Sequence, residues 1–158
     1  MPNAEHPVRT GKAPVWTDSD IDGLAGWNVI RAYLAFVPRM AQALAPAELS
    51  PAQFGILVQI DNSPGIAQGA LARRCLVTPQ SMGEALLPLE ALGLIVRGER
   101  PGRGHPIPVH ITDAGRRLVR KATKAVLEVN TPAAMGLTAA EQRTLVQLLR
   151  KVVGTLVP

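Results

Sequence analysis

The order of segments between residues 66 and 111 constrains the fold most strongly. Two stretches with helical periodicity, 66–74 and 79–92, are separated only by the residues CLVT. Thr78 and Pro79 are typical of a helix N-cap and of a first helical residue. The next stretches, LIVRGE and IPVHI, flank the turn RPGRGHP and have the composition of paired strands. This region therefore predicts two helices joined by a tight turn and followed by a β-hairpin.

Longer helices are predicted on both sides of this region. From residue 18 to residue 44 the apolar residues recur at helical spacing, with Asp18 or Ser19 as the N-cap, and Pro38 should kink this helix. Thr138 and Glu141 have the spacing of a capping box, which predicts the start of a last helix. The remaining helices are expected between the Ser50–Pro51 cap and a stop at 62–65, from Asp113 to about Asn130, and from the Thr138 cap to about Leu156.

Positive charge is concentrated in one segment. The chain has a formal charge of +5, and residues 97–124 hold eight arginines and lysines against two acidic residues. The remaining residues carry nine basic and ten acidic side chains, so this segment contains all of the excess. Such a concentration favours a polyanionic partner, because each contact with a phosphate releases counterions. A solvated basic helix face is an equally good interpretation of the charge alone.

Several functional classes are disfavoured. Cys75 is the single cysteine, so no intrachain disulfide is expected, and the prolines near the N-terminus and the lack of a long apolar run lead us to expect neither a signal peptide nor a membrane helix. We therefore expect a soluble cytoplasmic protein. His105 and His110 have poor spacing for zinc, and no nucleophile or pair of carboxylates stands at usable spacing. No metal, cofactor or enzymatic activity is expected.

Four motifs in register resemble one known family. They are the LA pair that includes Leu71, VTPQSM at the start of the second short helix, LEALGLIVR at its end, and ITDAG after the hairpin. Together, over residues 20–155, they resemble the MarR family of winged helix-turn-helix regulators. The resemblance implies a mainly α fold of the α+β class, a winged helix-turn-helix with a small β-hairpin wing and terminal dimerisation helices. The expected parts are an arm at 1–17, dimerisation helices at 18–46 and 130–158, and a DNA-binding domain at 47–129.

The resemblance also implies a function and its partners. We expect a sequence-specific transcriptional regulator, most simply a repressor, that binds double-stranded DNA as a homodimer on an inverted repeat. The final helix has the apolar stripe that a dimer needs. A small aromatic or lipophilic effector is a further partner that the family implies, and no membrane partner is expected.

The residues expected to contact DNA fall into three groups. The short polar side chains at the start of the second helix can reach base edges, with Gln80 as the best candidate. Arginines at the end of the first helix suit phosphates, or else form a solvated helix end, and the wing suits the minor groove. The predicted contacts are Thr78, Pro79, Gln80, Ser81, Glu84, Arg73, Arg74, Arg100, Arg103 and His105.

Three features depart from the family pattern. Arg103 and His105 stand where many relatives have an Asp and an Arg in the wing, so the usual wing salt bridge should be missing. Glu84 stands where a basic residue is common, and must accept a hydrogen bond from a cytosine amino group or weaken binding. Pro88 should kink the second helix near Leu86 or Leu87. Glu84 and Pro88 motivate the alternative of a winged-helix module that binds protein and has lost DNA binding.

Two further features have alternative interpretations. Cys75 lies four residues after Leu71, which favours core packing over an oxidation sensor. The chain's aromatic residues all precede residue 55, and Trp27, Tyr33 and Phe54 could line an effector pocket. Aromatic residues at helical spacing more often form core and dimer contacts.

Overall fold

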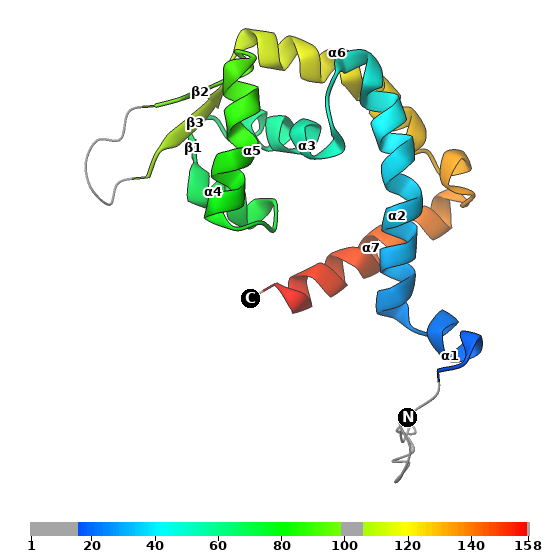
Figure 1. Ribbon diagram of the computed structural model, residues 1–158. Helices are drawn as coiled ribbons and strands as arrows, with labels where there is room; N and C mark the ends of the chain where they lie inside the picture. Colours follow the sequence, from blue (N-terminus) through cyan, green and yellow to red (C-terminus); the bar gives the residue numbers. More distant parts are fainter. Residues whose placement is uncertain (1–15, 99–105, 158) are drawn as a thin grey trace. The chain divides into compact units, whose positions relative to one another are not determined.

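The computed structural model describes residues 16–98 and 106–157. The chain divides between Phe36 and Val37 into two compact units, which we call the N-terminal unit and the main unit. The described part of the N-terminal unit contains α1 (Asp18–Asp22) and the first part of α2 (Ala25–Leu44). All other helices and strands belong to the main unit (Figure 1).

The single helix predicted from residue 18 is interrupted, which corrects the sequence interpretation. Thr17, not Asp18 or Ser19, caps α1, because its hydroxyl accepts from the Asp20 amide at 3.2 Å. The Asn28 side-chain amide donates to the carbonyls of Asp22 and Leu24, at 2.7 and 3.0 Å. These bonds satisfy carbonyls at the break, so α2 begins anew at Ala25. It then continues through Pro38, and the kink expected there stays a prediction.

The helix caps of the main unit form as the sequence predicts. The hydroxyls of Ser50, Thr78 and Thr138 each accept from the backbone amide three residues later, at 3.1–3.3 Å. The elements are η1 (Ala45–Ala47), α3 (Pro51–Asp61), β1 (Ile66–Ala67), α4 (Gln68–Arg74), α5 (Pro79–Ala91), β2 (Ile95–Arg97), β3 (Pro108–Ile111), α6 (Asp113–Val129), η2 (Ala133–Met135) and α7 (Ala139–Leu156).

The sheet of the main unit has three antiparallel strands in the order β1-β3-β2. The predicted hairpin is confirmed, with Ile95 paired to Ile111 and Arg97 to Val109. The prediction that a helix begins at Ile66 is wrong, because Ile66 pairs with Val109 as part of β1. The partner residues lie 43 and 41 positions further along the chain, and local periodicity carries no sign of them.

The core of the main unit decides which face of α5 remains free. Met82, Leu86 and Leu89 recur at helical spacing on α5 and are fully buried. Burying a side chain of this size is worth roughly 1.5–3 kcal/mol, so these three residues fix the rotation of the helix about its axis. The opposite positions are exposed, namely Gln80, Ser81, Glu84, Leu87 and Ala91. The bend expected near Leu86 or Leu87 stays a prediction, because α5 continues through Pro88 to Ala91.

The start of α6 is fastened to the start of β2. The Thr112 amide donates to the Leu94 carbonyl at 3.0 Å, and the Thr112 hydroxyl donates to the Gly93 carbonyl at 2.7 Å. Gly115 lies so close that a Cβ atom there would stand 2.3 Å from the Leu94 oxygen. The glycine of the ITDAG motif is therefore required for close packing of α6 against the hairpin.

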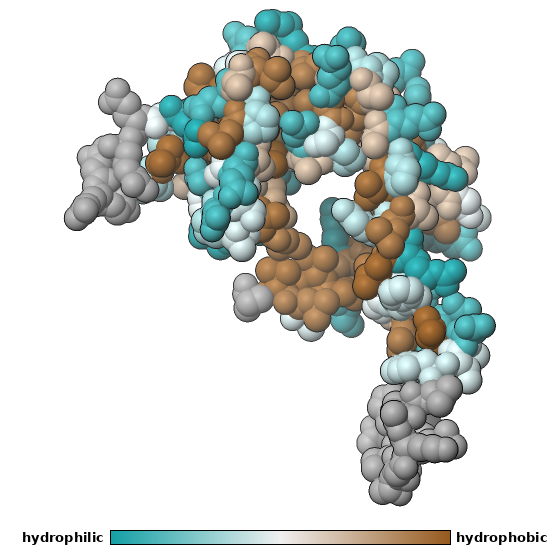
Figure 2. All heavy atoms as spheres, in the orientation of Figure 1, coloured by the Kyte–Doolittle hydropathy of each residue, from teal (hydrophilic) through white to brown (hydrophobic). Residues whose placement is uncertain are grey.

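Helix α7 contributes no buried residue, although much of it is apolar. Apolar side chains gather visibly over this helix in Figure 2. Leu156, the last residue of the helix, is 75% exposed. No helix in the described part of the chain combines the length and the apolar composition needed to cross a membrane.

Candidate nucleic-acid interface

Helices α4 and α5 form a helix-turn-helix whose turn is closed by backbone hydrogen bonds. The amides of Cys75 and Val77 donate to the carbonyls of Leu71 and Ala72, at 3.0 and 3.1 Å. Leu76 lies between them and has a left-handed backbone with φ of 56°. Its side chain is 58% exposed. This conformation usually requires glycine or asparagine, so the composition CLV did not indicate it.

The first turn of α5 uses two of the predicted polar contacts for its own structure. The Thr78 hydroxyl accepts from the Ser81 amide, and the hydroxyls of Thr78 and Ser81 lie 2.9 Å apart and share a hydrogen bond. Both residues are exposed, as is Pro79 at the first helical position. The lone pairs of these hydroxyls that remain free can still reach a partner outside the protein.

Gln80 and Glu84 occupy successive turns on the exposed face of α5. The side-chain amide of Gln80 donates to the Glu84 carboxylate, with 3.3 Å between Nε2 and Oε1. Because a carboxylate only accepts hydrogen bonds, this contact turns the amide nitrogen of Gln80 toward Glu84 and leaves the amide oxygen free. We call Gln80, Ser81, Glu84 and Leu87 the reading face. It carries no lysine or arginine.

Basic side chains adjoin α5 at the end of α4. Arg73 and Arg74 are both exposed. Arg74 is oriented by its hydrogen bond to the Ser63 hydroxyl, with 2.5 Å between Nη1 and Oγ. These positions fit side chains that contact phosphates, because they flank the helix-turn-helix and do not lie on the reading face.

The basic segment 97–124 uses part of its charge internally. Nε and Nη2 of Arg97 both donate to the Oε2 atom of Glu90 on α5, and this hydrogen bonding lowers the pKa of Glu90 and raises that of Arg97. Arg116 bridges Asp61 and Asp113, at 3.1 and 3.0 Å. Part of the positive charge therefore holds the hairpin and α6 in place. Lys124 lies 4.0 Å from the Glu128 carboxylate, and the exposed remainder on α6 comprises Arg117, Arg120 and Lys121.

The predicted wing contacts Arg100, Arg103 and His105 lie outside the described residues. Their anchors are described, because Gly98 donates from its amide to the Pro108 carbonyl at 2.9 Å and so extends the β2–β3 pairing. The wing contacts and the missing wing salt bridge stay predictions.

The three aromatic residues predicted to line an effector pocket belong to different units. Trp27 and Tyr33 lie on α2 in the N-terminal unit, where they are 42% and 65% exposed. Phe54 lies on α3 in the main unit and packs in its core. The environment of Phe54 fits the packing interpretation.

Cys75 and His110 show no sign of reactive or metal chemistry in the parts of the chain described. Cys75 packs against the core, and burial raises the pKa of its thiol, which agrees with the packing interpretation. His110 is exposed on β3 beside Gly65. Within 16–98 and 106–157 no group of three His, Cys, Asp or Glu side chains could hold a metal ion.

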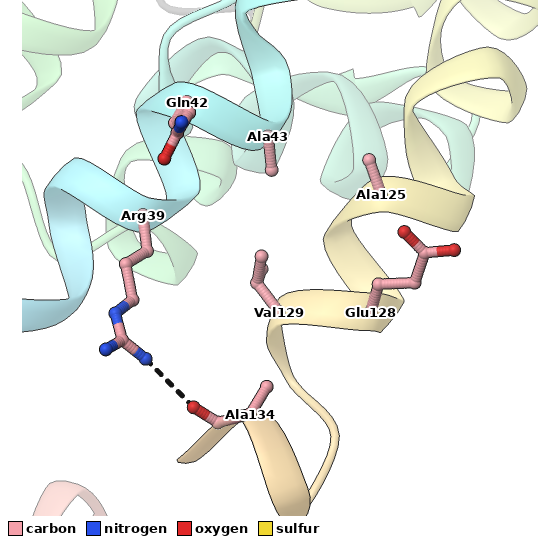
Figure 3. A pocket seen from close by; sticks show the side chains of 7 residues that line it. All are labelled: Arg39, Gln42, Ala43, Ala125, Glu128, Val129 and Ala134. Atoms are coloured by element: carbon pink, nitrogen blue, oxygen red, sulfur yellow. Dashed lines mark hydrogen bonds between the residues drawn. The ribbon is translucent and has the colours of Figure 1, made fainter.

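Two cavities of the main unit were not anticipated from the sequence. One, of about 370 Å³, lies between α2 and α6, where Arg39 donates to the Ala134 carbonyl at 2.9 Å (Figure 3). Glu128 and Gln42 also line it. The other, of about 360 Å³, lies between α3, the helix-turn-helix turn and α5, beside Cys75. No local sequence pattern marks either one, because each is formed by side chains distant in the chain.

The helix-turn-helix, its exposed polar helix and the antiparallel sheet define a winged helix-turn-helix protein. Residues 47–104 match the family model of the MarR family. The HTH-type transcriptional repressor Rv2887 of Mycobacterium tuberculosis is 32% identical over 130 residues, covering 82% of this chain and 94% of the relative. The chain therefore belongs to the MarR family.

Solved structures agree with this assignment. The structure of Rv2887 in complex with DNA is 31% identical, has a TM-score of 0.66 and covers 83% of this chain and 98% of its own. Rv2887 has also been solved with salicylic acid, with a TM-score of 0.64, 31% identity and coverage of 83% and 97%. The transcriptional repressor CouR bound to p-coumaroyl-CoA is 27% identical, with a TM-score of 0.75 and coverage of 87% and 96%.

Proposed function

We propose that this chain is a sequence-specific transcriptional repressor that binds duplex DNA as a homodimer. The observation that carries the proposal is the face of α5 opposite its buried side chains, where Gln80, Ser81 and Glu84 stand free at the start of the helix. A helix with short polar side chains at its exposed N-terminal end fits the major groove. The relatives solved with DNA, Rv2887 and CouR, support the same role.

The proposed DNA contacts divide by task. The reading face and Thr78 contact base edges. Pro79, the first residue of α5, lies beside them where the helix approaches the DNA backbone. Arg73 and Arg74 contact phosphates, and Arg100, Arg103 and His105 place the wing along the minor groove. Because α5 itself supplies no positive charge, the affinity depends on these flanking basic residues.

The dimer is proposed from exposed apolar surfaces, whose contact with water is unfavourable. Helix α7 exposes a stripe of apolar side chains, and the N-terminal unit exposes others on α2, including Trp27, Ile30 and Leu34. Apolar surface of this extent is typical of an interface. The α7 residues concerned are Val146, Leu149, Val152, Val153 and Leu156.

A small aromatic or lipophilic effector is proposed to release the DNA. The complexes of Rv2887 with salicylic acid and of CouR with p-coumaroyl-CoA support this class of ligand. Trp27 and Tyr33, both exposed on α2, are the proposed aromatic contacts. Binding releases DNA if it favours a separation of the two α5 helices that differs from that of the grooves.

The relatives are named as transcriptional regulators, and the proposal assigns this chain no catalytic reaction. A repressor acts where the chromosome lies, so the proposal places the chain in the cytoplasm. The alternative, a winged-helix module that binds protein, draws support from the absence of basic residues on α5 and from the exposure of Leu87 and Pro88.

The test is binding of the full chain to the duplex upstream of its own gene, measured by fluorescence anisotropy over a salt series. We expect nanomolar affinity that weakens roughly a thousand-fold between 50 and 200 mM salt. Absence of binding at low salt would contradict the proposal and favour the protein-binding alternative.

A matched pair of variants tests the role of the wing. Arg100→Glu with Arg103→Glu reverses two charges in the wing, and Arg117→Glu with Lys121→Glu makes the same change on α6. We expect the wing variant to lose much more affinity than the α6 variant. Equal losses would show that overall charge, and not the wing, supports binding.

A further inference from the structure

The reading face of α5 presents hydrogen-bond acceptors outward and no charged donor. The Gln80 amide nitrogen is engaged by Glu84, so its oxygen is the free end of that side chain. Glu84 contributes a carboxylate, which only accepts. Among the described residues Glu84 forms no ion pair.

The major groove offers two kinds of base edge to such a face. Cytosine N4 and adenine N6 are donors, whereas guanine O6 and N7 and thymine O4 are acceptors. A pair of acceptors on the protein attracts the amino groups and repels the other edges. From this arrangement we infer that Glu84, held by Gln80, selects a cytosine or adenine amino group at one fixed position in each half-site. This inference rests on the proposed function.

The contact between Gln80 and Glu84 is part of the reading mechanism. Residues four apart on a helix lie on the same face, and their hydrogen bond restricts both side chains before DNA arrives. Less conformational freedom is then lost on binding. Gln80 is thus a positioning residue for Glu84 in addition to its own contact.

The negative charge also disfavours wrong sequences. A carboxylate in the groove loses its hydration, and a hydrogen bond from a base amino group offsets that cost. A DNA sequence without the amino group leaves the carboxylate without this bond. The same charge repels phosphates and so lowers affinity for unrelated DNA. Leu87, one turn further along, is 54% exposed and adds no polar alternative for the base.

The experiment begins with selection of duplexes from a randomised pool by the full-length wild-type chain. In the selected operator, the cytosine or adenine at the common position is replaced by 2-pyrimidinone or purine, which lack the amino group. We expect the wild type to lose about ten-fold in affinity, equivalent to about 1.4 kcal/mol. Glu84→Ala should lose less than about two-fold on the same replacement, and Glu84→Lys should move the preference to guanine, whose acceptors suit an ammonium.

Glu128→Ala is the control, because it removes one exposed carboxylate from α6, which lies 4.0 Å from Lys124, and leaves α5 unchanged. It should keep the wild-type response to the missing amino group. If wild type and Glu84→Ala respond equally, the inference is wrong while the proposed function stands. If the wild-type chain selects no sequence at all, the proposed function itself fails, and this inference with it.

Discussion

Substitution of Gly115 by alanine tests the packing that holds α6 against the hairpin. A Cβ atom would lie 2.3 Å from the Leu94 oxygen and 2.7 Å from Cγ1 of Ile111, whereas ordinary contacts begin near 3.4 Å. The Leu94 carbonyl cannot retreat freely, because it accepts from the Thr112 amide at 3.0 Å. The added methyl group must therefore displace the first turn of α6 from the start of β2.

The expected magnitude follows from three contributions. Overpacking of a core costs roughly 1–3 kcal/mol. Loss or lengthening of the Thr112 hydrogen bond costs about 1 kcal/mol. Alanine recovers up to about 1 kcal/mol through its higher helix propensity. We expect a net loss of about 2 kcal/mol in the free energy of unfolding, which lowers Tm by roughly 4–8 °C for a chain of this size.

The assay is urea and thermal unfolding followed by circular dichroism, at one fixed protein concentration because a dimer's stability depends on it. Gly55→Ala is the control, since Gly55 lies in the exposed face of α3 with no atom within 4 Å of the added methyl group. It should gain up to about 1 kcal/mol. A Gly115→Ala protein as stable as the wild type, beside a Gly55→Ala protein that gains, would refute the close packing of α6 on β2.

Four further predictions concern local contacts. Leu76→Gly should raise the free energy of unfolding by roughly 0.5–1 kcal/mol in urea titrations, because glycine adopts a φ of 56° without strain and the exposed side chain loses little packing. Thr138→Ala should lower it by about 1 kcal/mol through loss of the α7 cap, and Thr138→Ser should restore most of it. Arg97 lowers the pKa of Glu90, so that pair stabilises the fold above the unfolded pKa of about 4.3. Glu90→Gln should therefore unfold at lower urea than wild type at pH 7, and the two midpoints should converge as the pH falls below about 4; a constant difference would exclude the ion pair. In the folded protein Cys75 should react with iodoacetamide more slowly than in urea, because burial raises its pKa.

Features that depend on neighbours in the chain were predictable. Ser50, Thr78 and Thr138 cap their helices because a hydroxyl needs only the amide three residues later. Strands β2 and β3 pair as predicted, because they lie close together in the chain and the segment that joins them is rich in glycine and proline. The order of these elements was sufficient to identify the winged helix-turn-helix.

The sequence predicted which residues belong to the candidate site. It did not predict the hydrogen bonds and ion pairs that these residues form. The exposure of Gln80, Ser81 and Glu84 follows from the helical period once Met82 and Leu86 are assigned to the core. The hydrogen bond from Gln80 to Glu84 depends on side-chain rotamers, and the ion pair between Arg97 and Glu90 depends on packing of α5 against β2. The ion pair changes the interpretation of charge, since the sequence count treats every ionised side chain as free.

By itself, the sequence determined which segments are helical, where most of them begin and which family of regulators the chain joins, because caps, periodicity and turn residues act over a few positions. Only the tertiary structure decided that Ile66 joins a strand, that Gly115 admits the Leu94 carbonyl, and that Arg97 of β2 pairs with Glu90 of α5. Each of these depends on groups that folding brings together from outside the local segment or on the side-chain conformation that packing selects. Their energies arise from contact and burial, to which local sequence patterns are insensitive.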